Sequence, residues 1–230
     1  MKTRNILLIS FLFLFCLSAK AQLNLKVGYS LGLFNPTKTN EILKQFNAEN
    51  PWLDDNFRDL NLMSGVMIGF RNRWDAVGLE LAWTSKFTKE RGSGDDPQTN
   101  SAFQRTYFYR VNTITAGLEF FPGGGGFCFG GTVDATDLNY KVEGTGYPDT
   151  EKIVDDFSLG SHFFVGFEVK TGDYMSVSFR PYIQIPWETF NIQGFERANF
   201  PDSTAPVEDF EENLFNFGIM LIFYNGRQTN

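Results

Sequence analysis

The stretch of sequence that decides the fold covers residues 157–187 and reads FSLGSHFFVGFEVK, TGDY and MSVSFRPYIQIPW. In both longer arms, bulky apolar residues alternate with small or polar ones. Successive side chains of a β-strand point to opposite faces, so each arm is predicted to be an amphipathic strand. The four-residue connection between the arms predicts an antiparallel hairpin.

The rest of the chain repeats this unit. Segments with the same alternation are predicted to be strands at residues 23–33, 60–70, 77–87, 107–120, 127–140, 157–170, 175–187 and 214–224. The connections between them are alternately long and short. In the first long connection, Thr39 or Asn40 is expected to cap a short helix that ends at the Asn50-Pro51 pair. The second, KERGSGDDPQTNSAFQR, and the third, residues 141–156, are expected to be loops.

Three strands carry irregular patterns. In residues 107–120 the apolar residues change phase between Val111 and Ile114, which predicts a β-bulge near residues 112–113. A similar slip is expected near residues 138–140. Pro181 has no backbone N–H to donate, so we expect a bulge or local distortion there.

Residues 1–21 are predicted to be a secretory signal peptide, which leaves residues 22–230 as an outer-membrane β-barrel domain. Lys2 and Arg4 precede an apolar run at residues 6–17, and residues 19–21, Ala-Lys-Ala, match the small-x-small cleavage rule. The run is too short for a membrane anchor. Cleavage would leave Cys128 as the single cysteine, so no intramolecular disulfide is expected.

The charge balance argues against nucleic acid as a partner. The chain carries 27 acidic and 20 basic residues, and loss of the signal peptide would bring the net charge to about −10. After residue 17, no apolar segment approaches the length of a membrane-spanning helix. A membrane-spanning form must therefore be a closed barrel.

The composition of the second strand face indicates which way the apolar face points. That face is rich in glycine and small hydroxyl residues, for example Gly28, Ser30, Gly69, Gly166 and Ser178. Small side chains suit the narrow interior of an eight-stranded barrel, and bulky apolar ones suit lipid. We predict an all-β fold: an eight-stranded antiparallel up-and-down transmembrane β-barrel with short periplasmic turns and long external loops. The alternative is a soluble lipocalin-like ligand-binding barrel with its apolar face inside.

The same alternation predicts a charged lumen near the periplasmic end. The residues expected there are Lys26, Arg71, Glu80, Glu119, Glu168, Lys170 and Arg180. Buried charges are tolerated when they are paired or hydrogen-bonded. We therefore expect a salt-bridge network that plugs the lumen, because eight strands leave no aqueous channel. A proton or ion path is the alternative.

His162 is the only candidate catalytic residue. A hydrolase needs a nucleophile within hydrogen-bond reach of the base. Ser161 points to the opposite face, and Ser158 lies too far along the strand, so we expect no catalysis; a lipid-modifying barrel enzyme is the alternative function. The glycine run at residues 123–126 lacks the Lys-Ser or Lys-Thr of a phosphate loop, and the acidic clusters match no calcium loop. We therefore expect neither cofactor nor metal.

Three stretches carry a resemblance to a known family: LNLKVGYSLGLF at residues 23–34, the helical first connection, and FVGFEVKTGDYMSVSFRPY at residues 164–182. With these features, residues 22–224 resemble the Bacteroidota outer-membrane β-barrel family, which includes the secretion-associated PorT-like proteins, and eight-stranded barrels of the OmpA and OmpX type. The resemblance implies an outer-membrane location and contact with outer-membrane lipid. Other envelope or secretion-complex proteins are the partners it suggests. It brings no catalytic residues.

Overall fold

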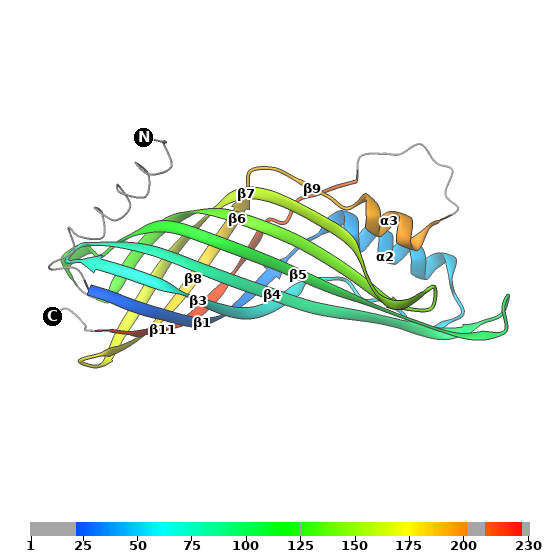
Figure 1. Cartoon of the computed structure of the whole chain (residues 1–230), viewed down its shortest axis with the longest axis horizontal. Coiled ribbons are helices and arrows are strands. Elements are labelled where there is room, and N and C mark those ends of the chain that lie inside the picture. The colour runs from blue at the N-terminus through cyan, green and yellow to red at the C-terminus, as the bar shows by residue number, and fades with distance from the viewer. Residues whose placement is uncertain (1–21, 125, 202–209, 227–230) are drawn as a thin grey trace, which may run out of the picture.

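Eight long strands form a closed antiparallel barrel in the computed structural model, which describes residues 22–124, 126–201 and 210–226 (Figure 1). The strands are β1 (Gln22–Phe34), β3 (Leu62–Trp74), β4 (Val77–Asp96), β5 (Ser101–Phe120), β6 (Phe127–Gly144), β7 (Tyr147–Gly172), β8 (Met175–Pro186) and β11 (Asn216–Asn225). Each pairs with the next along the chain, and β1 pairs with β11 to close the ring. The predicted eight-stranded up-and-down barrel is confirmed. The predicted signal peptide lies outside the described residues.

The two ends of the barrel differ. Tight connections, including η1 (Pro122–Gly124), join strands at one end, which we call the turn end. The opposite end, the loop end, carries α2 (Thr37–Glu49), β2 (Leu53–Asp55), β9 (Phe190–Asn191), α3 (Gln193–Asn199) and β10 (Glu211–Glu212). Figure 1 shows the two helices side by side over this end. The described helices are all too short or too polar to cross a membrane.

The helix expected in the first connection is present as α2, and it begins earlier than predicted. Its N-cap is Pro36 rather than Thr39 or Asn40, and the N-cap residue makes no side-chain capping hydrogen bond. Its C-cap is Asn50, so the helix ends where the Asn50-Pro51 pair predicts. Thr39 instead donates its backbone N–H to Glu212 Oε2 at 2.7 Å. The cap of α2 therefore comes from a distant segment, which a local pattern does not show.

Two of the expected loops are strands. Residues 89–105 mostly extend the β4–β5 hairpin, which stays paired up to Asp96 and Ser101. Residues 141–156 likewise extend β6 and β7, which stay paired up to Gly144 and Tyr147. Both loop predictions were wrong, because pairing with the neighbouring strand keeps these segments extended. In Figure 1 these extensions rise beyond the barrel and flank the helices.

The predicted β-bulge near residues 112–113 is also wrong. The β4–β5 register runs unbroken from Val77–Phe120 to Asp96–Ser101, and the β5–β6 register is equally continuous. The side chains of Tyr109, Val111 and Thr113 are all buried in the same phase, so the strand never changes face. What changes between Val111 and Thr113 is the polarity of the inner face.

The slip expected near residues 138–140 has the same explanation. Strand β6 keeps its register with β5 through this region, and Leu138 is buried in phase with Thr136. A register shift between β6 and β7 does follow Tyr140, but its extra residue lies in β7 at Ile153. The change of pattern in β6 therefore reflects a change of surroundings.

The distortion expected at Pro181 is present. On one side Pro181 pairs in register with Ile219 of β11. On the other side, the β7–β8 pairing stops between Phe164–Tyr182 and Phe167–Phe179 and resumes in the same register. The missing proline donor thus interrupts one ladder locally without shifting it.

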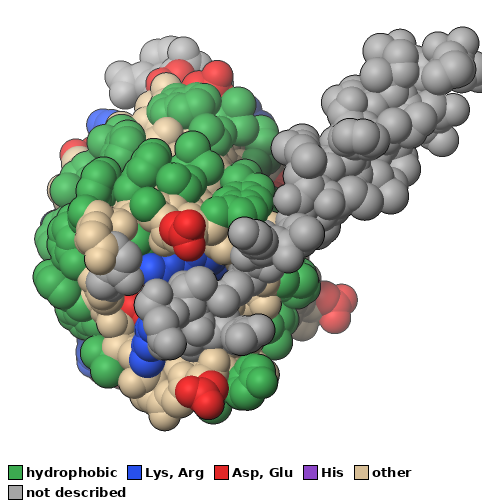
Figure 2. All heavy atoms as spheres, turned by 90° about the vertical axis from the view of Figure 1, so that its left-hand side faces the viewer, with side chains coloured by type: hydrophobic (Ala, Val, Ile, Leu, Met, Phe, Trp, Pro, Cys, Tyr) green, Lys and Arg blue, Asp and Glu red, His purple; other side chains and the backbone are tan. Residues whose placement is uncertain are grey.

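The outer wall of the barrel is apolar and its inner face is small or polar. Phe163, Val165 and Phe167 point outward and are 55%, 42% and 55% exposed, while Gly160 and Gly166 are buried inside. Similar large apolar side chains are exposed on all eight strands. Figure 2, which looks at the turn end, shows hydrophobic side chains around the wall and basic ones in the centre. The orientation is opposite to that of a lipocalin-like barrel.

Candidate functional site in the barrel lumen

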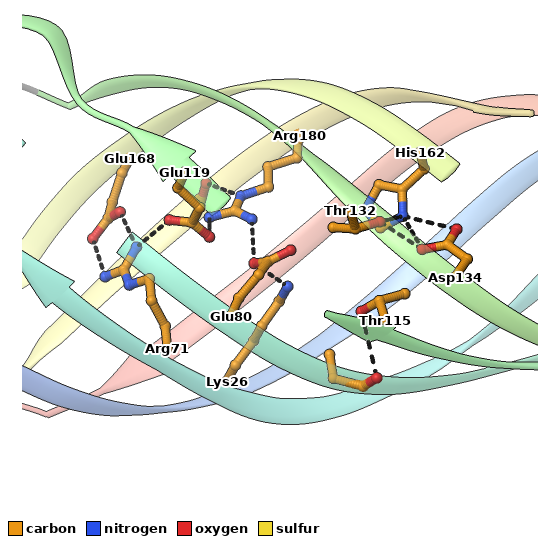
Figure 3. Close-up of polar contacts among 12 residues, drawn as sticks. Lys26, Arg71, Glu80, Thr115, Glu119, Thr132, Asp134, His162, Glu168 and Arg180 are labelled. Carbon is orange, nitrogen blue, oxygen red and sulfur yellow. Dashed lines mark hydrogen bonds and ion pairs between the residues drawn. The ribbon is translucent and has the colours of Figure 1, made fainter. Parts of the chain in front are cut away.

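The lumen near the turn end holds a layer of charged side chains from six different strands. The alternation brings six of the seven predicted residues together, all of them buried: Lys26, Arg71, Glu80, Glu119, Glu168 and Arg180. We call these six residues the charge layer. Figure 3 shows them converging from opposite walls of the barrel. Three cations face three carboxylates, so the layer is neutral when all six groups are ionised.

One half of the charge layer is held together by Glu80 and Arg180, which link Lys26 to Glu119. Lys26 Nζ lies 2.7 Å from Glu80 Oε2, and Arg180 Nη1 donates to the same oxygen at 2.9 Å. Arg180 Nη2 donates to Glu119 Oε1 at 2.6 Å. The Arg180 guanidinium also lies 4.6 Å from the centre of the Phe164 ring. Arg180 therefore bridges two carboxylates that would otherwise repel each other in a dry space.

Arg71 and Glu168 form the other half. Arg71 donates two hydrogen bonds to the Glu168 carboxylate, at 2.5 and 2.9 Å, in the bidentate geometry that is strongest for this pair. Ser176 Oγ donates to the same carboxylate at 2.6 Å. Arg71 Nη1 lies 3.7 Å from Glu119 Oε2, which connects the two halves. The Tyr224 ring covers the Arg71 guanidinium at 3.5 Å.

Lys170 does not join the charge layer, contrary to the prediction from alternation. Its side chain is exposed near the end of β7. The register with β8 shifts between Lys170 and Gly172, so Lys170 lies where the regular barrel has ended. A side chain there meets solvent even when its strand phase points inward.

A second set of buried polar residues crosses the lumen above the charge layer, and the predicted lumen charges did not include its two charged members, Lys86 and Asp134. Both lie on the inner face in phase with Thr84 and Thr132, as alternation predicts. The set forms a hydrogen-bonded chain that we call the polar chain: Lys86, Tyr182, Asn216, Gln184, Asp134, His162 and Thr132.

The contacts of the polar chain are continuous. Lys86 Nζ donates to Tyr182 Oη at 2.7 Å and to Asn216 Oδ1 at 3.3 Å. Asn216 Nδ2 donates to Gln184 Oε1 at 3.1 Å, and Gln184 Nε2 donates to Asp134 Oδ2 at 3.0 Å. These bonds connect polar side chains from four strands, β4, β6, β8 and β11, across the lumen.

His162 lies at the end of the polar chain, but its geometry does not match that of a catalytic histidine. Its Nδ1 lies 2.6 Å from Thr132 Oγ1 and 3.0 Å from Asp134 Oδ1 (Figure 3). In a hydroxyl–His–acid relay, the nucleophile and the acid must contact different ring nitrogens. Here both contact the same nitrogen. The Ser158 hydroxyl donates instead to the carbonyls of Leu159 and Glu188, both at 3.0 Å.

An aromatic and aliphatic core closes the lumen at the loop end. Phe195 of α3 is fully buried against three tyrosines, with ring centres 4.9 Å from Tyr107, 6.0 Å from Tyr109 and 5.6 Å from Tyr140. Burial raises the pKa of Tyr107 to about 12, so its phenol stays neutral and donates to Asn199 Oδ1 at 2.7 Å. Leu43 and Phe46 of α2 complete this core.

The charge layer, the polar chain and the aromatic core place side chains across the lumen at successive heights. At the turn end Phe121 is fully buried, with the Arg73 guanidinium 3.7 Å from its ring centre. Gly166 leaves the room that Arg180 needs, since a Cβ there would meet Cys128 Sγ at 2.6 Å and Arg180 Cγ at 3.2 Å. Within the described ranges, no group of three or more His, Cys, Asp or Glu side chains is arranged to hold a metal ion. The arrangement suits a static plug better than a reaction centre.

Comparisons with known proteins give structural likeness only. No protein-family model matches the sequence, and neither does any curated protein. Among solved structures, Ail, the attachment invasion locus protein of Yersinia pestis, aligns with a TM-score of 0.46 at 11% identity over 90% of this chain and 98% of that chain. Neisserial surface protein A aligns with a TM-score of 0.45 at 8% identity over the same shares. Likeness at this level carries no inference about function.

Proposed function

We propose that the chain is an outer-membrane β-barrel protein with a closed polar lumen. The observation that carries this proposal is the inversion of the barrel wall: Arg71 and Arg180 are buried, whereas Phe163 and Phe217 are exposed. Soluble monomers rarely expose a continuous apolar surface of more than a few hundred Å². A closed barrel also leaves no open sheet edge, because its backbone donors and acceptors pair between neighbouring strands, as lipid requires.

The exposed apolar side chains of the outer wall form a band around the barrel, which we call the apolar belt. Its height supports a membrane-spanning position. On β1, outward apolar residues alternate from Leu23 to Leu33. At about 3.3 Å per residue these eleven residues span about 33 Å along the strand. Strands tilted by about 40° cover about 25 Å of membrane normal over that length, which matches the apolar band of outer-membrane barrels.

We further propose that the protein acts without catalysis, as a structural or interaction protein, through its loop end. Three sets of side chains cross the described part of the lumen, which supports a closed interior, and neither Thr132 nor Ser158 is placed as a nucleophile for His162. The loop end has its own buried core, so its outer surface is held on a rigid base, as binding loops usually are. The family resemblance extends this proposal to a PorT-like member that serves as a subunit of an envelope or protein-secretion complex.

The first experiment tests insertion and closure. The protein, refolded into phospholipid vesicles, is expected to resist urea and alkaline extraction and to migrate faster in SDS gels before boiling than after. In planar bilayers, it should add no steady conductance. Recovery of folded protein without detergent would contradict membrane insertion, and stable ion-conducting steps would contradict the closed lumen.

A second experiment tests the loop end as the interaction surface. A photo-crosslinking residue replaces exposed Gln45 on α2, and the matched control carries it at Asp173 on the β7–β8 turn. We expect a discrete crosslinked partner only from position 45. Crosslinks from the turn end alone would contradict the proposal.

His162→Ala is expected to leave the lipid A profile of the cells unchanged, and an altered profile would favour the enzyme alternative.

A further inference from the structure

A row of basic side chains crosses the outer face of four neighbouring strands just beyond the apolar belt. Strand pairing places four residues in one line across the sheet: Lys89, Phe108, Lys141 and Lys152. Arg110 lies on the same face of β5, two residues closer to the belt than Phe108. The four cations are exposed and line an open concavity of about 810 Å³. We call Lys89, Arg110, Lys141 and Lys152 the basic row.

The basic row is poorly neutralised by the protein itself. Lys152 pairs with Asp155 at 2.6 Å, and the nearby Asp137 accepts a hydrogen bond from Asn112 at 3.2 Å. In the part of the chain that the structure describes, no ion pair involves the other three cations of the row. This is a local excess of positive charge on a chain with more acids than bases.

Arg110 lies close to the height of the polar layer of a bilayer. Ile114 is the last exposed large apolar residue of the unbroken apolar series on the outer face of β5, and Arg110 follows four residues further toward the loop end. That separation is about 13 Å along the strand and about 10 Å along the membrane normal after tilt. The polar layer reaches about 5–8 Å beyond the hydrocarbon. Long Lys and Arg side chains can bend toward it across that difference.

We propose that the basic row binds the phosphate group of an anionic membrane lipid. This inference rests on the proposed membrane-spanning function. Arg110 supplies a planar fork that matches phosphate oxygens, and Lys89 and Lys141 add point charges on either side of it. Phe108 lies between the two lysines and is partly exposed, so it offers an apolar contact for the part of the lipid next to the phosphate.

The experiment compares lipid retention by purified proteins. Wild type and the variant Lys89→Gln/Arg110→Gln/Lys141→Gln are incubated with mixed micelles that contain phosphatidylglycerol and phosphatidylcholine of equal chain length. Native mass spectrometry then counts the retained lipids. We expect wild type to prefer the anionic lipid, and the triple variant to lose about fivefold in that preference for each cation removed. The matched control, Lys38→Gln/Lys44→Gln/Arg197→Gln, removes three exposed cations elsewhere at the loop end and should keep the preference.

The outcomes separate this inference from the proposed function. Unchanged preference in the triple variant, or equal loss in the control, would overturn the lipid site. Retention of inorganic phosphate without any preference for the anionic lipid would assign the row to a soluble anion and also overturn it. All proteins are first tested for urea-resistant insertion into vesicles. Wild type that inserts without lipid preference defeats only the lipid site, whereas wild type that fails to insert defeats both proposals.

Discussion

The two halves of β5 show opposite polarity on the same strand face. Toward the loop end, its inner face carries Tyr107, Tyr109 and Val111, packed on α3 and the neighbouring strands. Toward the turn end, the same face carries Thr113, Thr115 and Glu119, and the apolar residues lie outside. The register with both neighbours is unbroken across the change.

The comparison teaches that the polarity of a strand face depends on what surrounds it. Beyond the belt, the outer side of β5 meets water, so the apolar side chains turn inward as in a soluble protein. Within the belt, the proposed lipid outside accepts apolar side chains, and the lumen takes the polar ones. The two regions therefore have different stabilising interactions: ion pairs and hydrogen bonds inside the belt, and apolar packing under the helices.

Removal of Arg180 should cause the largest loss of stability, because it breaks the charge layer inside the barrel at the height of the apolar belt. Arg180→Ala leaves Glu80 and Glu119 facing each other with one bridging cation fewer. We expect a loss of about 3–5 kcal/mol in the free energy of unfolding. Urea unfolding in vesicles, followed by tryptophan fluorescence, measures it.

Two further variants test the reason for that loss. Arg180→Ala combined with Glu119→Gln should recover part of the stability, because one uncompensated carboxylate is gone. Lys170→Ala removes an exposed lysine on β7 and should change stability by no more than about 0.5 kcal/mol. A loss from Lys170→Ala as large as that from Arg180→Ala would contradict the placement of the charge layer.

Truncation of Phe195 should affect the loop end alone. Phe195→Ala removes a fully buried ring from α3, and we expect a local loss of about 3 kcal/mol. Hydrogen exchange should speed up in α3 and in the extension of β5, and remain slow in the belt. Arg197→Ala, an exposed change on the same helix, is the control. Faster exchange throughout the barrel would show that the two regions fold as one unit.

A matched pair of arginine substitutions tests the boundary on β5 directly. Ala116 and Ala102 are both exposed on the outer face of this strand, inside and beyond the belt respectively. In vesicles, Ala116→Arg should cost about 2 kcal/mol or more, because it places a charge in hydrocarbon. Ala102→Arg should stay within about 0.5 kcal/mol. Equal costs would remove the basis for assigning lipid to one region and water to the other.

The smallest expected effect concerns Glu212, which caps α2 from β10. Glu212→Ala leaves the Thr39 N–H without its partner and should cost the loop end about 1 kcal/mol. Burial raises the pKa of Glu212, so the folded state disfavours its ionised form. Its contribution is therefore complete below the unfolded pKa of about 4.3 and declines as pH rises through the folded pKa.

The isosteric variant separates the hydrogen bond from the charge. Glu212→Gln keeps an acceptor for Thr39 and removes the buried charge. Hydrogen exchange in α2 should be slower in this variant than in wild type at neutral pH, and equal to it below pH of about 4. Slower exchange at all pH values would contradict a role for the raised pKa.

Much of the barrel could be predicted from local pattern. A period of two is a property of neighbouring residues, so it identified all eight strands, their antiparallel order and the faces of Lys26, Arg71 and Glu168. It did not identify the strand extensions, because residues 89–105 contain Gly, Asp and Asn that are typical of loops. It also predicted a β-bulge in β5 that is absent, because one face of this strand does not keep one polarity along its whole length.

The sequence by itself determined the closed antiparallel barrel, its apolar outer wall and the set of charges that face inward. Only the tertiary structure decided which charges meet, as Arg71 and Glu168 do from strands distant in the chain. It also decided that Lys170 lies outside the layer and that Lys86 and Asp134 belong to a second one. The physical reason is that strand phase is set locally, whereas height in the lumen depends on the tilt and register accumulated around the closed ring.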